Sequence, residues 1–224
     1  DRASDETIFL AGKVSPARVQ PIHPGSFVRV KNGLPADAEL AALTLECWVR
    51  PWKLSQWQGI LAQHDYPDRS GFGLFLDPGG RAVFYIGSGG AYDAGSLVTG
   101  PKLNLRQWHH LVGVWDAEAK IATIWVDGKR AAEWQAPNNL PPRKAGPAGL
   151  QIGAYSERGV TGRFFDGDIA MPAIYTRALG ADEIAARLGK RGLEAPDLGD
   201  PSIAAFWPLD EERGSSVADA SGNR

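Results

Sequence analysis

Apolar and polar side chains alternate along many short runs of this chain, which is the pattern of half-buried β-strands. In the run SFVRVKNG, for example, Val28 and Val30 fall on one face of such a strand. The runs that predict strands are 26–33, 43–52, 59–65, 71–87, 107–116, 121–134, 150–155, 163–179 and 203–210. Short segments rich in Gly, Pro and Asp separate these runs, so the sequence predicts closely spaced strands joined by turns.

Turn residues predict how some of these strands are connected. Residues 71–87 form two strands on either side of Pro78-Gly79-Gly80, and Asp127-Gly128 is a favoured hairpin dipeptide. Residues 137–149, PNNLPPRKAGPAG, are expected to form a long surface loop because Pro and Gly oppose regular structure.

A single run, residues 179–189, has a helical pattern, about two turns long, with Asp182 and Glu183 near its positive N-terminal end. Strands dominate and do not alternate with helices, which predicts an all-β fold: a two-sheet antiparallel β-sandwich with one short helix near the C-terminus. We expect residues 1–190 to form the sandwich. Residues 191–224 should supply a linker and a final strand that either belongs to the sandwich or leads into a following domain of the parent chain.

Two adjacent histidines, His109 and His110, stand in the run QWHHLVGVWD and raise the question of a metal site. Successive side chains of a strand point to opposite faces, so these two cannot bind one ion from a regular strand. His23 and His64 have no spacing that would join them. We therefore expect structural histidines that are buried or half-buried and hydrogen-bonded to their neighbours.

The chain has eight tryptophans, and most of them fall into two groups by position. Those within predicted strands are expected to fill the core: Trp48, Trp108, Trp115 and Trp125. Those at strand ends or in loops could anchor a partner domain, because Trp is enriched at interface hot spots: Trp52, Trp57 and Trp134.

The composition narrows the class of partner and the compartment. Of the 224 residues, 43% are hydrophobic and 22% are charged, which is ordinary for a soluble domain. The formal net charge of −2 predicts no general attraction to nucleic acid or to an anionic membrane, and no apolar run is long enough to span a bilayer. Cys47 is the only cysteine and leaves no internal disulfide, which favours a cytoplasmic location over a secreted or periplasmic one.

The sequence contains no strong catalytic motif. Glycoside hydrolases need two carboxylates flanking the scissile bond, whereas Glu46 stands alone on its strand. No G-x-S-x-G motif occurs, and Cys47 lies in an apolar strand, where a buried thiol is inert. We therefore expect no catalytic residue and no enzyme activity in this chain alone.

A calcium site is the one cofactor site that the sequence suggests. Asp219, Ser221 and Asn223 in the motif D-A-S-G-N place oxygen atoms at alternate positions, and Gly222 allows a tight turn. An Asx-type turn without a metal ion is the alternative.

A glycan site would need exposed aromatic side chains beside polar loop residues, since sugar rings stack on aromatic faces while hydroxyls take hydrogen bonds. Trp57 and Tyr66 flank one loop region, and Tyr92 and Asp93 lie in another. The alternative is that these are scattered surface aromatics or anchors of a protein interface.

The order of these elements resembles a laminin-G-like domain of the concanavalin A-like lectin/glucanase superfamily. The resemblance spans residues 26–188 and implies a jelly roll of two antiparallel sheets, in agreement with the alternation of side chains. The segments that carry it are Trp108-His109-His110, Trp125-Val126-Asp127-Gly128, and Phe165-Asp166-Gly167 followed by Tyr175, Ala178-Leu179 and Glu183-Ile184.

The tail AFWPLDEERGSSVADASGN (205–223) looks like the opening motif of a module of this kind. With the linker before it, it resembles the join in large subunits of N,N-dimethylformamidase-type amidohydrolases. In that family a laminin-G-like domain precedes a catalytic region with a mononuclear iron held by tyrosines and a carboxylate. The resemblance implies that iron would bind only downstream of Arg224. Because the chain begins at Asp1 without a secretory signal, we expect a processed chain or a fragment.

Two functional classes stay open at this point. The first is a non-catalytic accessory domain that contacts other domains or subunits of a larger amidohydrolase, whose downstream site hydrolyses a small N-substituted amide. The second is a lectin-like module that binds a glycan or a protein ligand outside the cell. The unpaired Cys47 and the tail at 205–223 favour the first.

Overall fold

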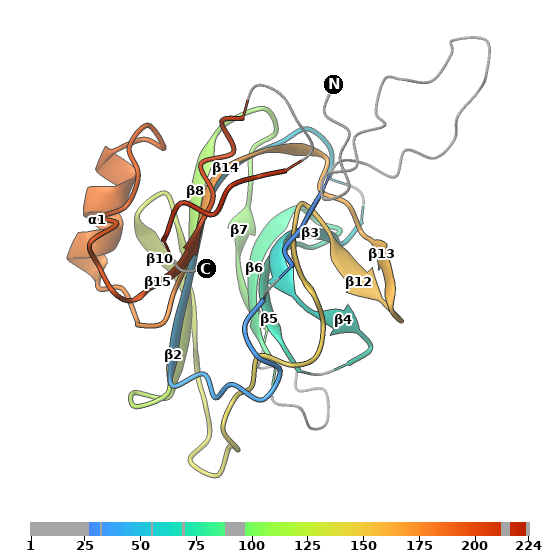
Figure 1. Ribbon diagram of the computed structural model, residues 1–224, viewed down its shortest axis with the longest axis vertical. Coiled ribbons are helices and arrows are strands. Elements are labelled where there is room, and N and C mark those ends of the chain that lie inside the picture. The colour runs from blue at the N-terminus through green and yellow to red at the C-terminus, as the bar shows by residue number, and fades with distance from the viewer. Residues whose placement is uncertain are drawn as a thin grey trace.

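The structure is a computed structural model that describes residues 27–31, 33–54, 56–68, 70–87, 97–211 and 216–222. Within these residues, two six-stranded antiparallel sheets pack face to face (Figure 1). The first sheet has the order β1 (Val28–Arg29), β11 (Leu150–Ile152), β3 (Gln58–Gln63), β5 (Phe72–Leu76), β6 (Arg81–Ile86) and β7 (Leu97–Lys102). The second has the order β10 (Lys129–Gln135), β9 (Ile121–Val126), β8 (His109–Asp116), β2 (Ala42–Pro51), β14 (Gly167–Tyr175) and β15 (Ile203–Phe206).

Two further elements lie outside this sandwich. A small sheet of β13 (Val160–Gly162), β12 (Tyr155–Glu157) and β4 (Asp65–Tyr66) lies beside the first sheet (Figure 1). Helix α1 (Ala181–Gly189) covers part of the outer face of the second sheet. In the part of the chain that the structure describes, no helix is long and apolar enough to cross a membrane. The predicted antiparallel sandwich with one short helix is confirmed.

The main core fills the space between the two sheets. On β2, Leu43, Leu45 and Cys47 point inward, because alternate residues of a strand share a face. They pack with inward-facing residues of the first sheet, among them Phe72 and Leu74 on β5. Burial raises the pKa of the Cys47 thiol far above its usual range, which keeps it protonated and unreactive, as expected for a thiol in an apolar strand.

At Gly113 on β8, the second sheet lies close to a side chain of the first. A Cβ atom at this position would overlap the aromatic ring of Phe84 on β6, which is fully buried. Gly113 therefore leaves the space that the Phe84 ring occupies, and the distance between the sheets depends on this missing side chain.

Gly113→Ala should lower the free energy of unfolding by about 1–3 kcal/mol, because an overpacked core forces side chains or backbone to shift. Urea unfolding followed by circular dichroism measures this loss. Gly149→Ala is the matched control, since nothing lies within 4 Å of its added Cβ. An equal effect of the two substitutions would contradict the proposed contact.

Some elements differ from the sequence prediction. The hairpins expected in 71–87 and around Asp127-Gly128 are present as β5–β6 and β9–β10. The run 26–33 gives only the two residues of β1. The strand β7 was not predicted, because its sequence LVTGPK contains Gly and Pro; as the edge strand of its sheet, it tolerates a proline.

The C-terminal segment folds back on the sandwich. β15 pairs with β14 as the edge of the second sheet, and both Phe206 and Trp207 are buried. Residues 216–222 return to this strand, since the Ala220 amide donates to the Phe206 carbonyl at 2.8 Å. The aromatic part of the tail thus contributes to the core of this sandwich.

Candidate functional site

Four side chains form an exposed group of aromatic and charged residues at one end of the second sheet. They are Arg50, Trp52, Trp108 and Asp168, and we call them the Trp52–Trp108 platform. Trp52 and Trp108 are 54% and 42% exposed, although tryptophan is largely buried in most proteins. The side chains of Arg50 and Asp168 are 39% and 34% exposed. A ligand in solution can therefore reach all four.

Strand register brings the platform together from three parts of the chain. Arg50 on β2 lies opposite Asp168 on β14, and directly opposed residues project their side chains from the same face. Trp108 directly precedes β8 and lies two residues before His110, so it shares the face of His110. That face is the outer one, which also carries α1.

Two backbone hydrogen bonds fix the segments at this end of the sheet. The Arg106 amide donates to the Pro51 carbonyl at 2.7 Å, which ties the segment before Trp108 to the end of β2. The Trp52 amide donates to the Asp166 carbonyl, also at 2.7 Å. The platform is therefore built on a fixed backbone.

A single carboxylate oxygen organises the side chains. Asp168 Oδ2 accepts hydrogen bonds from Arg50 Nε at 2.6 Å and from Trp52 Nε1 at 2.9 Å. The guanidinium carbon of Arg50 lies 5.1 Å from the centroid of the Trp108 ring, within the range of a cation–π contact. Trp52 is thus held by the edge of its indole, while most of the ring stays exposed.

The platform combines the two kinds of contact that a sugar needs. The exposed indole rings offer flat apolar faces, and Arg50 and Asp168 offer charged donors and acceptors beside them. The prediction that Trp108 fills the core is wrong. Its position on the outer face follows from the alternation, but none of the described helices and strands covers the ring, which is 42% exposed.

Further along the same face, the next pair of rings is covered. Trp48 stacks on His110 with ring centroids 5.1 Å apart and an interplanar angle of 28°. Gly192, which follows α1 with a φ of 68°, lies against the Trp48 ring. A Cβ there would approach the indole to 3.1 Å, so a glycine at this position allows the chain to close over Trp48.

Beneath α1, Glu46 is fully buried and holds several partners. Its carboxylate accepts hydrogen bonds from Tyr175 Oη at 2.8 Å and from Arg187 Nε at 3.0 and 3.1 Å, and it lies 2.9 Å from His110 Nε2. Burial alone would raise the pKa of Glu46, but the hydrogen bond with His110 and the charge of Arg187 outweigh it and lower the pKa. The same environment raises the pKa of Tyr175. Glu46 is thus an anion that joins the helix to the sheet.

Arg187→Met should lower the free energy of unfolding by about 3–5 kcal/mol at neutral pH, because it leaves a buried carboxylate without its cation. Urea unfolding measures the loss. Lys190→Met, at the end of the same helix, removes only an exposed ion pair with Glu194 and should cost less than about 1 kcal/mol. Similar losses for both variants would show that Glu46 does not depend on Arg187.

The sequence of residues 25–185 matches the laminin-G type of the concanavalin A-like lectin/glucanases superfamily. This match covers well over half of the chain and agrees with the two-sheet fold. The chain belongs to this superfamily. The predicted laminin-G resemblance is thereby confirmed, whereas the link to N,N-dimethylformamidases stays a prediction. No curated protein matches the sequence of this concanavalin A-like domain.

Solved structures share the fold at low sequence identity. A candidate carbohydrate-binding protein from Bacteroides ovatus is 15% identical with a TM-score of 0.61, over 88% of this chain and 54% of that protein. The CBM40 module of a Ruminococcus gnavus IT-sialidase, bound to α2,3-sialyllactose, is 15% identical with a TM-score of 0.54, over 67% and 84%. A pentraxin from Limulus polyphemus is 13% identical with a TM-score of 0.54, over 88% and 91%. The domain thus spans about half of the Bacteroides protein, and these similarities establish its fold.

The adjacent histidines of this concanavalin A-like domain lie on opposite faces, as predicted. His109 Nδ1 lies 2.8 Å from Asp127 Oδ2, and the His110 amide donates to Asp127 Oδ1 at 2.9 Å. The hydrogen bond with Asp127 raises the pKa of His109. Burial alone would raise the pKa of Asp127, but the hydrogen bonds that it accepts lower it. In the described part of the chain, no three His, Cys, Asp or Glu side chains gather as a metal site.

Asp127→Asn should lower stability more near pH 5.5 than near pH 8.5. Because folding raises the pKa of His109, its protonated form stabilises the fold. This contribution is complete below about pH 6.5 and is lost as the pH rises through the folded-state pKa. Because folding lowers the pKa of Asp127, its ionised form stabilises the fold above about pH 4. The charged pair therefore contributes most to stability between about pH 4 and pH 6.5. Asn retains the Oδ1 acceptor and tolerates the φ of 51° at this position.

Urea unfolding of both proteins at the two pH values measures the difference. Asp116→Asn serves as the control, because that carboxylate accepts backbone hydrogen bonds from Glu118 and Ala119 in a turn without a histidine partner. A pH-independent effect of Asp127→Asn would contradict the charged pair.

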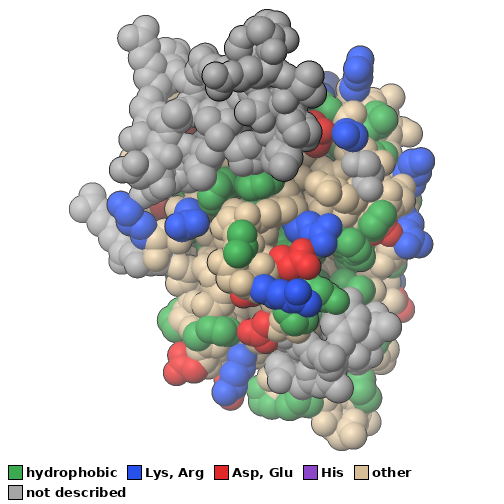
Figure 2. All heavy atoms as spheres, turned by 90° about the vertical axis from the view of Figure 1, so that its right-hand side faces the viewer, with side chains coloured by type: hydrophobic (Ala, Val, Ile, Leu, Met, Phe, Trp, Pro, Cys, Tyr) green, Lys and Arg blue, Asp and Glu red, His purple; other side chains and the backbone are tan. Residues whose placement is uncertain are grey.

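Two of the aromatics predicted for a glycan site, Trp57 and Tyr66, lie on or beside the first sheet. Trp57 is half-buried and packs against Phe75, Tyr85 and Tyr155 on the outer face of the first sheet. Tyr66, on the small sheet, is 46% exposed. Figure 2 shows the face with the small sheet, where acidic and basic side chains lie next to one another. Tyr92 and Asp93 lie outside the described residues, so the predicted rim of four residues is not tested.

The predicted calcium ligands are partly described. Asp219 Oδ1 accepts hydrogen bonds from the Ser221 amide at 2.9 Å and the Phe206 amide at 3.1 Å, which is the geometry of the Asx-type alternative. Asn223 lies outside the described residues. Calcium binding there stays a prediction.

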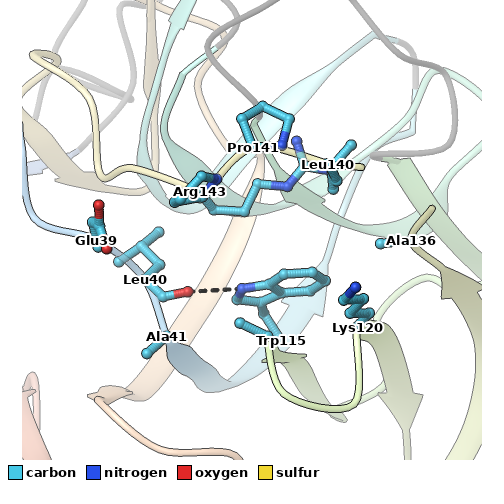
Figure 3. Close-up of a pocket in the computed structure, with 11 residues that line it drawn as sticks. Glu39, Leu40, Ala41, Trp115, Lys120, Ala136, Leu140, Pro141 and Arg143 are labelled. Carbon is cyan, nitrogen blue, oxygen red and sulfur yellow. Dashed lines mark hydrogen bonds between the residues drawn. The ribbon is translucent and has the colours of Figure 1, made fainter. Parts of the chain in front are cut away.

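A pocket of about 280 Å³ opens at the opposite end of the second sheet, near the start of β2 and the end of β8 (Figure 3). The Trp115 indole forms one wall and donates from Nε1 to the Leu40 carbonyl at 2.8 Å. Arg143 crosses above it, with its guanidinium carbon 5.8 Å from the Trp115 ring centroid and 5.2 Å from that of Trp134. Arg143 is only 1% exposed, so its charge lies within the wall and is hardly accessible to a ligand.

Sequence reasoning missed the platform as a unit. It placed Trp52 at a strand end and suggested an anchoring role for it, but it did not select Arg50 or Asp168. The alternation of β2 could have placed Arg50 and Trp52 on one face. The pairing of β2 with β14 could not be read from the sequence, and it is this pairing that brings Asp168 to them.

Proposed function

We propose that this domain is a non-catalytic carbohydrate-binding module and that the Trp52–Trp108 platform is its sugar site. The observation that carries the proposal is the pair of exposed indoles linked to one Arg–Asp ion pair. Exposed apolar side chains that gather beside polar groups mark a binding site, and these two indoles lie beside groups that form hydrogen bonds. Isolated surface aromatics would not both contact one ion pair, whereas Trp52 binds Asp168 and Trp108 lies against Arg50.

The fold and the chemistry of the buried carboxylate support a binding role. The Bacteroides and Ruminococcus structures with the same fold are described as carbohydrate-binding or hold a glycan. If this domain were a glycosidase, Glu46 on β2 would be the candidate catalytic carboxylate. It is 0% exposed, however, and three side chains bind it. A sugar cannot reach it while α1 is in place.

The accessory role in a larger amidohydrolase is a second proposal. It rests on the resemblance of the tail 205–223 to the join in N,N-dimethylformamidase-type subunits. A sugar-binding surface and a role beside a catalytic region are compatible. A sialidase from Streptococcus pneumoniae matches 65% of this chain over only 24% of its own length, with a TM-score of 0.54. In that case the platform would face the solvent or a neighbouring subunit.

A glycan array screened with the unmodified chain first selects a glycan that binds. Trp52→Ala and Trp108→Ala should each weaken binding of this glycan about tenfold to a hundredfold, because each removes an exposed stacking face. Isothermal titration calorimetry with the selected glycan measures the change. Both side chains are exposed, so the urea midpoint should change little.

Tyr66→Leu is the control, since it removes an exposed aromatic from the small sheet, where the sequence suggested a glycan site. If it abolished binding while the tryptophan variants bound normally, the site would lie on the other face. If no glycan bound to the unmodified chain, the carbohydrate-binding proposal would be wrong.

A further inference from the structure

We infer that the platform selects glycans that carry a carboxylate and that Arg50 recognises this group. This inference rests on the proposed function and adds the class of ligand. Uronic acids and sialic acids share this chemistry, a pyranose ring with a planar carboxylate. The inference follows from which atoms of Arg50 are used within the protein and which are not.

Arg50 uses one side of its guanidinium within the protein. Its Nε donates to Asp168 Oδ2 at 2.6 Å, and its guanidinium carbon lies over the Trp108 ring, 5.1 Å from the centroid. Its terminal nitrogens, Nη1 and Nη2, form no hydrogen bond with the described residues, and the side chain is 39% exposed. Two parallel N–H groups of a guanidinium match the two oxygens of a carboxylate, and such bidentate pairs are stronger than neutral hydrogen bonds.

The ion pair with Asp168 prepares Arg50 for this role. Asp168 Oδ2 and the Trp108 ring fix the guanidinium in one orientation, so less conformational entropy is lost when an anion binds. Asp168 Oδ2 already accepts two hydrogen bonds, so Oδ1 is the main acceptor left for a sugar hydroxyl, whereas Nη1 and Nη2 of Arg50 carry four N–H groups. The free donors of the platform therefore outnumber its free acceptors.

The surrounding charges also favour an anion. The three segments that build the platform are 50–53, 106–108 and 166–168. They contain three cationic residues, Arg50, Lys53 and Arg106, and two acidic ones, Asp166 and Asp168. The platform therefore has a local excess of positive charge on a chain whose formal net charge is −2.

The geometry allows one sugar residue to use both kinds of contact. Trp52 Nε1 and Arg50 Nε bind the same oxygen atom, so the exposed face of Trp52 lies within one sugar ring of the guanidinium. The Arg50 guanidinium covers part of the Trp108 ring, which leaves Trp52, at 54% exposure, as the larger stacking face. We place the pyranose ring on Trp52 and its carboxylate on the Nη edge of Arg50.

The experiment compares matched acidic and neutral sugars on the full chain by isothermal titration calorimetry. The pairs are 3′-sialyllactose with lactose, and a hyaluronan tetrasaccharide with its carboxyl-reduced form. We expect the acidic member of at least one pair to bind about tenfold or more tightly. The pair that responds identifies the source of the carboxylate. Equal binding of both members in both pairs would overturn the inference but leave the carbohydrate-binding proposal intact.

Substitutions test the role of Arg50 itself. Arg50→Gln should abolish the preference for the acidic sugar, and Arg50→Lys should restore only part of it because an ammonium cannot form the bidentate pair. Lys144→Gln removes the same charge from an exposed position beside the pocket at the opposite end of the sheet, and it should change affinity less than about twofold. Urea midpoints verify that each variant is folded. A preference that survives Arg50→Gln would contradict the assignment.

A sulfated ligand is tested separately. Carboxyl-reduced chondroitin sulfate retains the sulfate groups and lacks the carboxylates. If it bound as tightly as untreated chondroitin sulfate, the platform would recognise sulfate and the inference would be wrong. If no sugar bound, or if Trp52→Ala left binding unchanged, the proposed function would fail together with the site.

Discussion

The buried carboxylate of Glu46 determines which part of the second sheet is covered and which part is free. It lies on β2 and binds His110 of β8, Tyr175 of β14 and Arg187 of α1. Three neighbouring strands and the helix therefore depend on one anion. A carboxylate without these partners would be too costly to bury, so the helix and the charge require each other.

As a consequence, the side chains on the outer face of β2 change along the strand from covered to exposed. Glu46 lies under α1, and Trp48 lies under the turn that follows the helix at Gly192. Two residues further, Arg50 is 39% exposed, and Trp52 beyond it is 54% exposed. The helix and the turn after it therefore cover β2 only as far as Trp48, and the platform begins at Arg50. The contact that stabilises the fold thus also leaves a row of polar and aromatic side chains accessible.

The sequence predicted the fold class well, because the alternation of side chains is a local property. It placed His109 and His110 on opposite faces and located the hairpins β5–β6 and β9–β10. It could not reveal the partners of Glu46, which lie 64, 129 and 141 residues away along the chain. It also misjudged Trp108, since alternation gives the face of a residue but not whether another element covers that face. The proposed site depends on strand pairing and cover, and neither is encoded in a short motif.

The two ends of the second sheet show why the platform, and not the pocket, suits a sugar. Each end places an arginine over a tryptophan ring, Arg143 over Trp115 and Arg50 over Trp108. Arg143 is 1% exposed, so its charge lies within the wall of the pocket and is hardly accessible to a ligand. Arg50 has an exposed side chain that is oriented by Asp168. A glycan is polar over most of its surface and keeps much of its hydration, so it binds more readily to an open, oriented donor than to a covered one.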